Sequence, residues 1–320
     1  MQRPRFLPDN FTLGLLGSVL LASLLPCSGE AARWLAWLTD AAIGLLFFLH
    51  GAKLSRQAVL AGITHWRLHL LVLAATFVLF PLLGLLLQPL LAALTTPPLA
   101  LGLLYLCLLP STVQSSIAFV SVADGNVPAA ICSATASNLL GIALTPLLVG
   151  WLLLAGEAGH SGASALAIVY QLLLPFVAGQ LLRSWLGDWV DRHKGKLKLV
   201  DQGSILLVVY TAFSAAVIGG LWQATPLPAL GGLLLACALL LTLALGLTRL
   251  ASRQLGFTRA DEITIVFCGS KKSLASGVPM AKVLFAGHAI GAIVLPLMLF
   301  HQLQLMVCAL LAQRYRRQQR

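Results

Sequence analysis

Ten long apolar runs constrain the fold of this chain more than any other feature of its sequence. Because lipid offers the backbone no hydrogen-bond partners, a run of about 20 apolar residues crosses a bilayer as a helix. The composition agrees, since 59% of the residues are hydrophobic and only 10% are charged, too few for a soluble surface. We therefore predict an all-α integral membrane protein and exclude soluble enzymes, nucleic-acid-binding modules and disordered scaffolds. The runs cover residues 11–27, 33–53, 67–93, 98–119, 127–155, 163–184, 202–221, 227–249, 261–283 and 288–313.

The basic residues predict the orientation of these spans. With ten spans, both termini and every even-numbered loop share one side, and nearly all Lys and Arg outside the spans lie there. The opposite side carries only Arg33 and Lys282. This asymmetry predicts a multi-pass protein of the bacterial inner membrane with cytoplasmic N- and C-termini. The net charge of +11 is then explained by topology, with the lipid bilayer and not a nucleic acid as partner.

The chain divides into two halves of five spans, residues 1–156 and 157–320, within a single membrane domain. Because five is odd, the second half must enter the membrane inverted, which is typical of secondary transporters. Spans four and nine are both interrupted by polar residues near their middles: residues 109–116 read LPSTVQSS, and residues 268–273 read CGSKKS. Inverted-repeat transporters place substrate and coupling-ion sites where such broken helices meet.

Two lysines, Lys271 and Lys272, lie halfway through span nine, between Ser270 and Ser273. A lysine at the bilayer centre costs about 2.5–3.5 kcal/mol, so both ammonium groups must face protein or water. They either act directly in binding or coupling, or they cap the end of a broken helix. We expect a direct role.

A second set of polar residues lies in spans four, five and ten. Small hydroxyl residues also hold transmembrane helices together, so each is individually a packing residue or a ligand. Together, facing an unwound segment, they predict an oxygen-lined site, in which Ser115, Ser116 and Asn138 are candidate sodium ligands. Asp40 is either the partner of a lysine or a residue of an outer vestibule, and His50 lies at the end of span two. The remaining candidates are Gln114, Ser133, Thr135, Ser137, His301 and Gln302.

Motifs for other chemistry are missing from the sequence. It has no G-x-x-x-x-G-K-[ST] phosphate loop, no H-E-x-x-H and no C-x-x-C among its six cysteines. An intramembrane serine hydrolase built from Ser270 and His301 is the enzymatic alternative, but any pair of spans offers a serine and a histidine. We predict a protein that is not an enzyme and has no cofactor, with Na⁺ or H⁺ as its coupling ion.

Three stretches carry a resemblance to a known family: residues 45–54 (LLFFLHGAKL), 109–118 (LPSTVQSSIA) and 261–273 (DEITIVFCGSKKS). They resemble the bile acid:sodium symporter family, in the branch of the seventh vertebrate bile-acid carrier and its bacterial relatives. The resemblance implies a panel domain (spans 1, 2, 6 and 7) that moves against a core domain (spans 3–5 and 8–10). It also implies that spans four and nine cross at their unwound centres, and that Ser115 and Ser116 match a Ser-Asn pair.

The ninth span departs from that pattern. Phe267 stands where sodium-coupled relatives carry a sodium-binding glutamate, and Lys271 and Lys272 stand where they carry a glutamine and an asparagine. The usual two sodium sites thus lose an anionic ligand and gain two ammonium groups.

We therefore predict a secondary active transporter that moves a small organic anion by alternating access. In one version a lysine ammonium replaces sodium, attracts the anion and carries the coupling proton. In another, neutral oxygens of spans four and five hold sodium and the lysines cap helices. A non-transporting regulator or scaffold for envelope or ion homeostasis is the alternative from another class. The identity of the anion and the oligomeric state stay open.

Overall fold

The structure, a computed structural model, describes residues 10–53, 65–153 and 162–318. Within these ranges the secondary structure is helical and contains no strand. The elements are α1 (Asn10–Leu24), α2 (Gly29–Lys53), α4 (Trp66–Ala74), the π-helix η1 (Ala75–Leu79), α5 (Phe80–Leu94), α6 (Pro97–Leu108), α7 (Gln114–Val122), α8 (Val127–Leu152), α9 (Gly162–Arg192), α10 (Lys194–Ile218), α11 (Leu221–Ala224), α12 (Leu227–Gln254), α13 (Arg259–Gly269), α14 (Leu274–Leu284) and α15 (Ile290–Arg317).

Within the described residues, every predicted apolar run corresponds to one helix or to consecutive helical elements. Six helices in the described part of the chain are long and apolar enough to cross a membrane: α2, the helix over Trp66–Leu86, α8, α10, α12 and α15. Asn10–Leu24 and Pro97–Leu108 are shorter apolar helices. The all-helical class and the multi-pass membrane character are therefore confirmed, whereas the count of ten spans stays a prediction.

Large apolar side chains on the outside of the molecule fit a lipid environment. Trp34, Trp37 and Trp185 are each more than three-quarters exposed, which is costly in water over so wide a surface. The interior is filled by other apolar residues, among them Phe80 and Phe300, whose rings meet edge to face. The apolar surface is thus turned toward lipid as well as toward the core.

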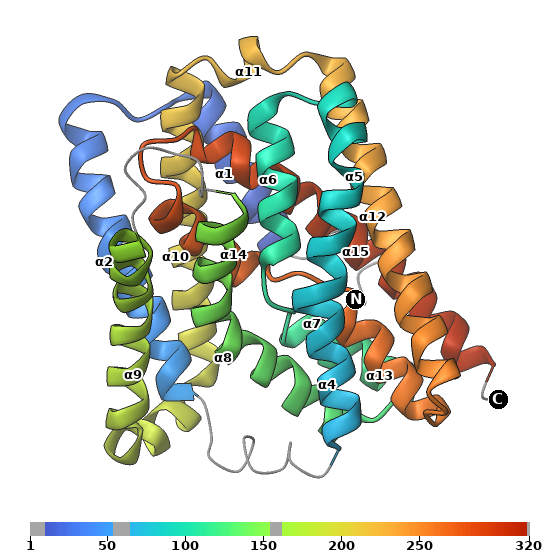
Figure 1. Cartoon of the computed structure of the whole chain (residues 1–320). Helices are drawn as coiled ribbons and strands as arrows, with labels where there is room; N and C mark the ends of the chain where they lie inside the picture. Colours follow the sequence, from blue (N-terminus) through green and yellow to red (C-terminus); the bar gives the residue numbers. More distant parts are fainter. Residues whose placement is uncertain (1–9, 54–64, 154–161, 319–320) are drawn as a thin grey trace, which may run out of the picture.

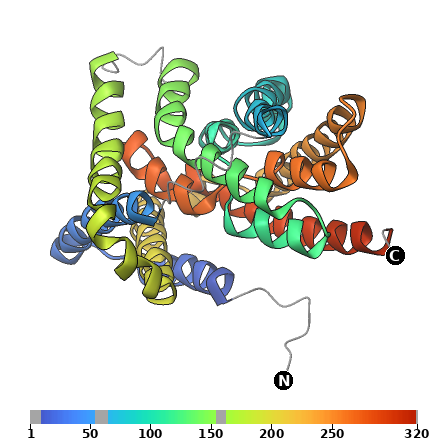
Figure 2. The same ribbon diagram turned by 90° about the horizontal axis from the view of Figure 1, so that it is seen from below.

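The helices form two groups (Figures 1 and 2). One group consists of α1, α2, α9 and α10, in which α2 packs along α9 and α10 packs on α1 and α2. The other contains α4 to α8 and α12 to α15, with α15 packed on α6 and α12 on α13. The groups meet mainly where α10 contacts α14 and α15, and where α8 contacts α9. The two interrupted helix pairs, α6–α7 and α13–α14, both belong to the second group.

The first group is held by a very close approach of α2 and α9. A Cβ atom added at Gly51 would lie 2.0 Å from the carbonyl oxygen of Phe176, and one at Gly179 would lie 2.0 Å from that of Phe48. Two backbones approach this closely only where side chains are absent, as at other small-residue contacts between membrane helices.

Candidate functional site

The polar interruptions predicted in spans four and nine are breaks in the helices. The helix α6 ends at Leu108 and α7 begins at Gln114, because Pro110 between them has no N–H for a helical hydrogen bond. The helix α13 ends at Gly269, and α14 begins at Leu274 with Ser273 as its cap. The Ser276 N–H donates to Ser273 Oγ at 3.2 Å. Each break leaves helix-end N–H and C=O groups without intrahelical partners.

The two breaks satisfy many of these groups by contacting each other. The Ser273 N–H donates to the carbonyl of Pro110 at 2.9 Å. In the reverse direction, Ser111 Oγ donates to the carbonyl of Cys268 at 2.5 Å. The meeting of the two unwound segments, which belong to opposite halves of the sequence, is therefore fixed by direct hydrogen bonds.

The helix α8 supports this contact from the side. The Ser111 N–H donates to Ser137 Oγ at 3.0 Å. Asn138 Nδ2 donates to the Ser111 carbonyl at 2.6 Å, and its Oδ1 accepts from Ser276 Oγ at 2.9 Å. Asn138 thus bridges the α6–α7 break and the start of α14.

Lys272 is fully buried and its ammonium is saturated by backbone carbonyls. Nζ donates to Thr76 O at 2.8 Å, to Cys107 O at 2.9 Å and to Leu109 O at 2.7 Å. Thr76 lies in the π-helix η1, where the α-helical hydrogen-bond pattern is replaced. Three acceptors match the three donors of an ammonium group, so Lys272 caps the end of α6 and ties it to η1. The Phe80 ring covers the same Nζ at 4.2 Å.

The backbone of Lys272 is also paired. Its N–H donates to Gln304 Oε1 at 2.9 Å, and its carbonyl accepts from Gln304 Nε2 at 3.0 Å. The same amide is hydrogen-bonded to His301 Nδ1 at 2.9 Å. Gln304 therefore fixes the break in span nine from α15 and links it to His301.

Lys271 is equally buried but has different surroundings. Among the described residues, its Nζ has no hydrogen-bond partner. It lies instead over two aromatic rings, 4.4 Å from the centre of Phe119 and 5.6 Å from that of Phe267. The two adjacent lysines are therefore chemically distinct, one locked among oxygens and one enclosed by phenyl rings.

A cavity of about 220 Å³ opens beside the breaks, and we name it the break cavity. One wall belongs to the helix group that carries the breaks and contributes hydroxyl, amide and imidazole groups. The facing wall comes from α1, α2 and α10 and carries Lys198 and Asp201, the latter paired with Lys53. The polar and charged residues of its lining are His50, Thr112, Gln114, Ser115, Asn138, Lys198, Asp201, Gln202, Ser273, Ser276 and His301.

Five of the residues predicted for the site line this cavity: Gln114, Ser115, Asn138, Ser273 and His301.

The other predicted residues lie outside its lining. Ser116, Ser137, Ser270, Lys271 and Lys272 are buried behind it. Ser133 is hydrogen-bonded to His69 at 2.6 Å, Gln302 Nε2 donates to Thr12 Oγ1 at 3.4 Å, and Thr135 is a half-buried residue of α8.

Several lining residues were not predicted. His50 was expected only at the end of span two, and Lys198, Asp201 and Gln202 lie at or just before the predicted start of span seven. In the sequence these residues appear only as charged and hydrogen-bonding residues near the ends of spans. Such residues cannot be told apart from those of an ordinary solvated loop.

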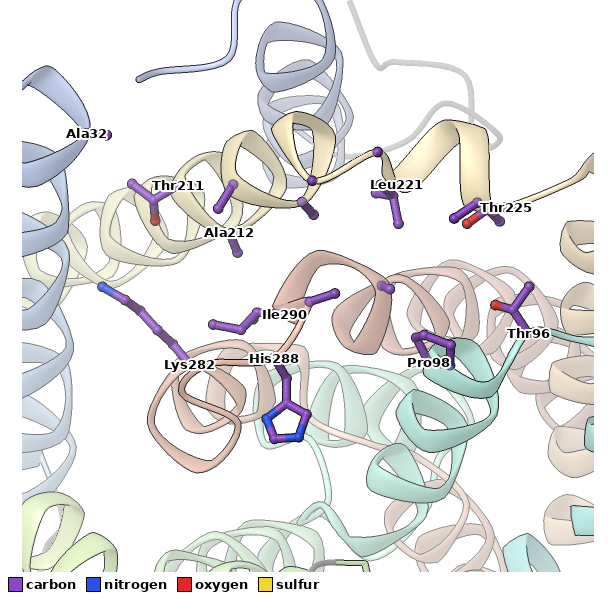
Figure 3. Close-up of a pocket in the computed structure, with 18 of the residues that line it drawn as sticks. Ala32, Thr96, Pro98, Thr211, Ala212, Leu221, Thr225, Lys282, His288 and Ile290 are labelled. Atoms are coloured by element: carbon purple, nitrogen blue, oxygen red, sulfur yellow. The ribbon is translucent and has the colours of Figure 1, made fainter. Parts of the chain in front are cut away.

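A second cavity, of about 710 Å³, lies at the other end of α2 and α10. We name it the Lys282 cavity. Figure 3 shows Lys282 extending toward the helix that carries Ala32, with Thr211 and Ile290 on either side of the space. Lys282 Nζ donates to Asp40 Oδ1 at 2.7 Å, so Asp40 is the partner of a lysine, although of neither Lys271 nor Lys272.

Comparisons with known proteins identify the family of this chain. Residues 9–317 match the SBF-like CPA transporter family. The chain belongs to this transporter family. It is 68% identical over 318 residues to PA2026 of Pseudomonas aeruginosa (99% of this chain, 96% of the relative). It is 56% identical over 310 residues to YfeH of Escherichia coli K12 (97% and 93%), whose name proposes a symporter. It is also 30% identical over 319 residues to sodium/bile acid cotransporter 7-B of Xenopus laevis (96% and 91%).

The match to the SBF-like family confirms the resemblance that was predicted from residues 45–54, 109–118 and 261–273. Family and relatives together indicate a symporter-like membrane transporter. The matched residues, 9–317, include both helix breaks and the residues that line both cavities.

The Xenopus relative is named for sodium, but the candidate sodium ligands of this SBF-like chain are already engaged. Ser115 Oγ donates to Thr112 Oγ1 at 2.8 Å, and Ser116 Oγ donates to Phe267 O at 3.1 Å. The side-chain amide of Asn138 is hydrogen-bonded to Ser111 O and to Ser276 Oγ. Over residues 10–53, 65–153 and 162–318, no group of three or more His, Cys, Asp or Glu could hold a metal ion. The hydroxyl protons of Ser115 and Ser116 and the side-chain amide of Asn138 are thus engaged by protein partners in this structure.

Proposed function

We propose that this protein is a secondary active transporter that moves a small organic anion by alternating access without sodium. The observation that carries the proposal is the pair of cavities on one interface. The break cavity and the Lys282 cavity both lie between the two helix groups, at opposite ends of α2 and α10. Between the cavities, α10 packs on α14 and α15. Two half-paths separated by one packed contact are what alternating access requires.

In this proposal the group of α1, α2, α9 and α10 is the panel domain and the remaining helices form the core domain. The chain has ten spans arranged as two inverted repeats, residues 1–156 and 157–320. The equivalent positions of the two breaks, in the fourth and ninth spans, support this arrangement. The termini are cytoplasmic in the bacterial inner membrane, so that the break cavity opens to the cytoplasm and the Lys282 cavity to the opposite side.

An anionic substrate is supported by the charges around the break cavity. Lys198 adds a positive charge to the lining, and Asp201 is paired with Lys53. The side-chain amides of Gln114 and Gln202 add N–H donors of the kind that bind carboxylate or sulfate oxygens. The cavity therefore favours a small anion with several oxygen atoms.

Lys272 supports independence from sodium. Its ammonium binds three carbonyls from two segments, η1 and the end of α6, as a bound cation would, and it is covalently part of the protein. A permanent cation at this position removes the electrostatic need for a dissociable one. The polar lining at the meeting of the breaks also argues against a non-transporting scaffold, which would have no use for a solvent-lined crossing.

The test is a flux assay in proteoliposomes with a panel of carboxylates and sulfonates, run under separate sodium and proton gradients. We expect saturable uptake of at least one anion in sodium-free buffer. Strict dependence on sodium would refute the sodium-independent mechanism, and the absence of flux for every anion would refute the transport proposal. Gln114→Trp should block flux by filling the break cavity. The matched control is Ala118→Trp, on the same helix but outside the lining, which should preserve it.

A further inference from the structure

A chain of three hydroxyl groups leads from the break cavity into the protein. Ser115 and Thr112 line the cavity, and Ser115 Oγ donates to Thr112 Oγ1 at 2.8 Å. Thr112 Oγ1 is hydrogen-bonded to Ser116 Oγ at 2.9 Å, and Ser116 is fully buried. Ser116 in turn donates to the carbonyl of Phe267.

The hydrogen bonds that link these three hydroxyl groups all run in one direction. Since Ser116 donates its only hydroxyl proton to Phe267 O, the donor in the bond between Thr112 and Ser116 is Thr112, which in turn accepts from Ser115. Hydroxyl groups arranged in this way can pass a proton along, because each accepts one proton and donates another. The three hydroxyl groups therefore lead from the cavity toward the segment that carries Lys271.

Lys271 is suited to receive that proton, and Lys272 is not. The Lys272 ammonium faces three carbonyls, and deprotonation would leave a lone pair among oxygen lone pairs. The Lys271 amino group has no hydrogen-bond partner among the described residues, so its neutral form leaves no acceptor unsatisfied. The faces of Phe119 and Phe267 are able to hold the charged form by cation–π contact. Both protonation states are thus accommodated at Lys271 alone.

Few other ionisable groups surround Lys271. Two thiols, Cys268 on α13 and Cys308 on α15, interact with it electrostatically. Glu262 lies at the far end of α13 and is engaged by three arginines. Other titratable or charged side chains on the elements packed around it include Arg67 and His69 on α4, Cys132 on α8, Arg249 and Arg253 on α12, Arg259 and Asp261 on α13, and His301, Arg314, Tyr315, Arg316 and Arg317 on α15.

We propose that Lys271 Nζ is the proton-binding site that couples anion transport to the proton gradient, loaded through Ser115, Thr112 and Ser116. This inference rests on the transport function proposed above. A hydronium ion in the cavity gives a proton to Ser115 Oγ, each hydroxyl passes its own proton onward, and the Lys271 lone pair accepts the last one. Neutral amine becomes ammonium and hydronium becomes water. The final step requires the Ser116 hydroxyl to turn from Phe267 O toward the amine.

The test measures proton and anion movements together in proteoliposomes that contain a trapped pH dye. With wild-type protein, addition of a transported anion at equal pH on both sides should move protons along with it. Anion counterflow without any proton movement would overturn the proton site and leave the transport function intact. Failure of counterflow itself would instead refute the transport function. The two proposals therefore fail in distinguishable ways.

Variants then locate the proton site. Lys271→Met removes the acceptor, and Lys271→Arg keeps a cation that does not release its proton, so both should lose anion-driven proton movement. Ser116→Ala interrupts the relay and should slow it. Lys196→Met, an exposed residue of α10 outside both cavities, should behave as wild type. If Lys271→Met does not fold, Lys271→Arg and Ser116→Ala decide, and wild-type proton movement in both would overturn the proposal.

Discussion

The ammonium of Lys272 donates a hydrogen bond of 2.7 Å to the carbonyl of Leu109, and this bond joins the two interrupted helix pairs. The same nitrogen reaches Cys107 O at the end of α6 and Thr76 O in the π-helix. One side chain thereby neutralises the negative end of a helix and a disrupted turn of another. The lysine holds the crossing together through its charge and its three donors.

Lys272→Met should therefore destabilise the fold strongly. Each buried carbonyl that loses its donor costs about 1–3 kcal/mol, and Lys272 serves three of them. The measurement is the midpoint of thermal unfolding in detergent, followed by tryptophan fluorescence. The matched control is Lys271→Met, which replaces an amine without hydrogen-bond partners by an apolar chain and should leave the midpoint unchanged or raise it. Equal losses in both variants would contradict the different roles of the two lysines.

The close contact of α2 and α9 gives a second prediction. Gly51→Ala or Gly179→Ala places a methyl group 2.0 Å from a backbone oxygen of the other helix, so the two helices must separate. Overpacking of this kind costs about 1–3 kcal/mol or more. Thermal unfolding should begin at a lower temperature in either variant. Gly44→Ala, on the same helix with nothing within 4 Å of the added Cβ, should be neutral. An unchanged midpoint in Gly51→Ala would show that the helices tolerate separation.

The helices and their breaks were predictable because their causes are local. A long apolar run forms a helix in lipid whatever surrounds it, and Pro110 and the Gly-Ser-Lys-Lys-Ser segment interrupt helices by their own chemistry. Even so, α9 extends to Arg192, well past the predicted end at residue 184. Charged residues at a span end do not stop a helix, so hydropathy marks the edge of lipid and not the edge of the helix.

The partners of the lysines were not predictable. Lys272 is held by the carbonyls of Thr76, Cys107 and Leu109, and a backbone carbonyl leaves no signature in a sequence. The π-helix η1 likewise has no residue pattern that distinguishes it from the α-helix around it. The sequence placed two ammonium groups at the crossing, but which one is satisfied by the backbone depends on three-dimensional packing.

Lys198 provides a test of anion binding in the break cavity. Replacing it by Gln removes a positive charge from the lining, so the apparent KM for the transported anion should rise about tenfold, equivalent to about 1.4 kcal/mol. The maximal rate should change little, since Lys198 lies outside the helix breaks. Concentration-dependent uptake in proteoliposomes measures both quantities. Lys196→Gln removes the same charge from an exposed position on the same helix, outside the cavity. This variant should keep the wild-type KM. Parallel increases in both variants would point to surface potential and not to a contact in the cavity.

Gly291 lies where α15 packs on α10 at the Lys282 cavity. A Cβ atom there would lie 2.6 Å from the Cβ of Ala216 on α10, and its neighbours Ile290 and Ala292 line the Lys282 cavity. Gly291→Ala should therefore push α15 away from α10 and open that cavity. Cys27 lines the same cavity, while the other five cysteines are buried, so the native chain carries its own reporter.

We expect Gly291→Ala to speed the labelling of Cys27 by a membrane-impermeant maleimide and to slow anion flux, because the closed contact forms less often. Mass spectrometry of the labelled protein measures the first effect, and proteoliposome uptake measures the second. Gly246→Ala adds the same methyl group where nothing lies within 4 Å, and neither quantity should change. Slower labelling of Cys27, or unchanged labelling with unchanged flux, would mean that this contact does not control the opening of the Lys282 cavity.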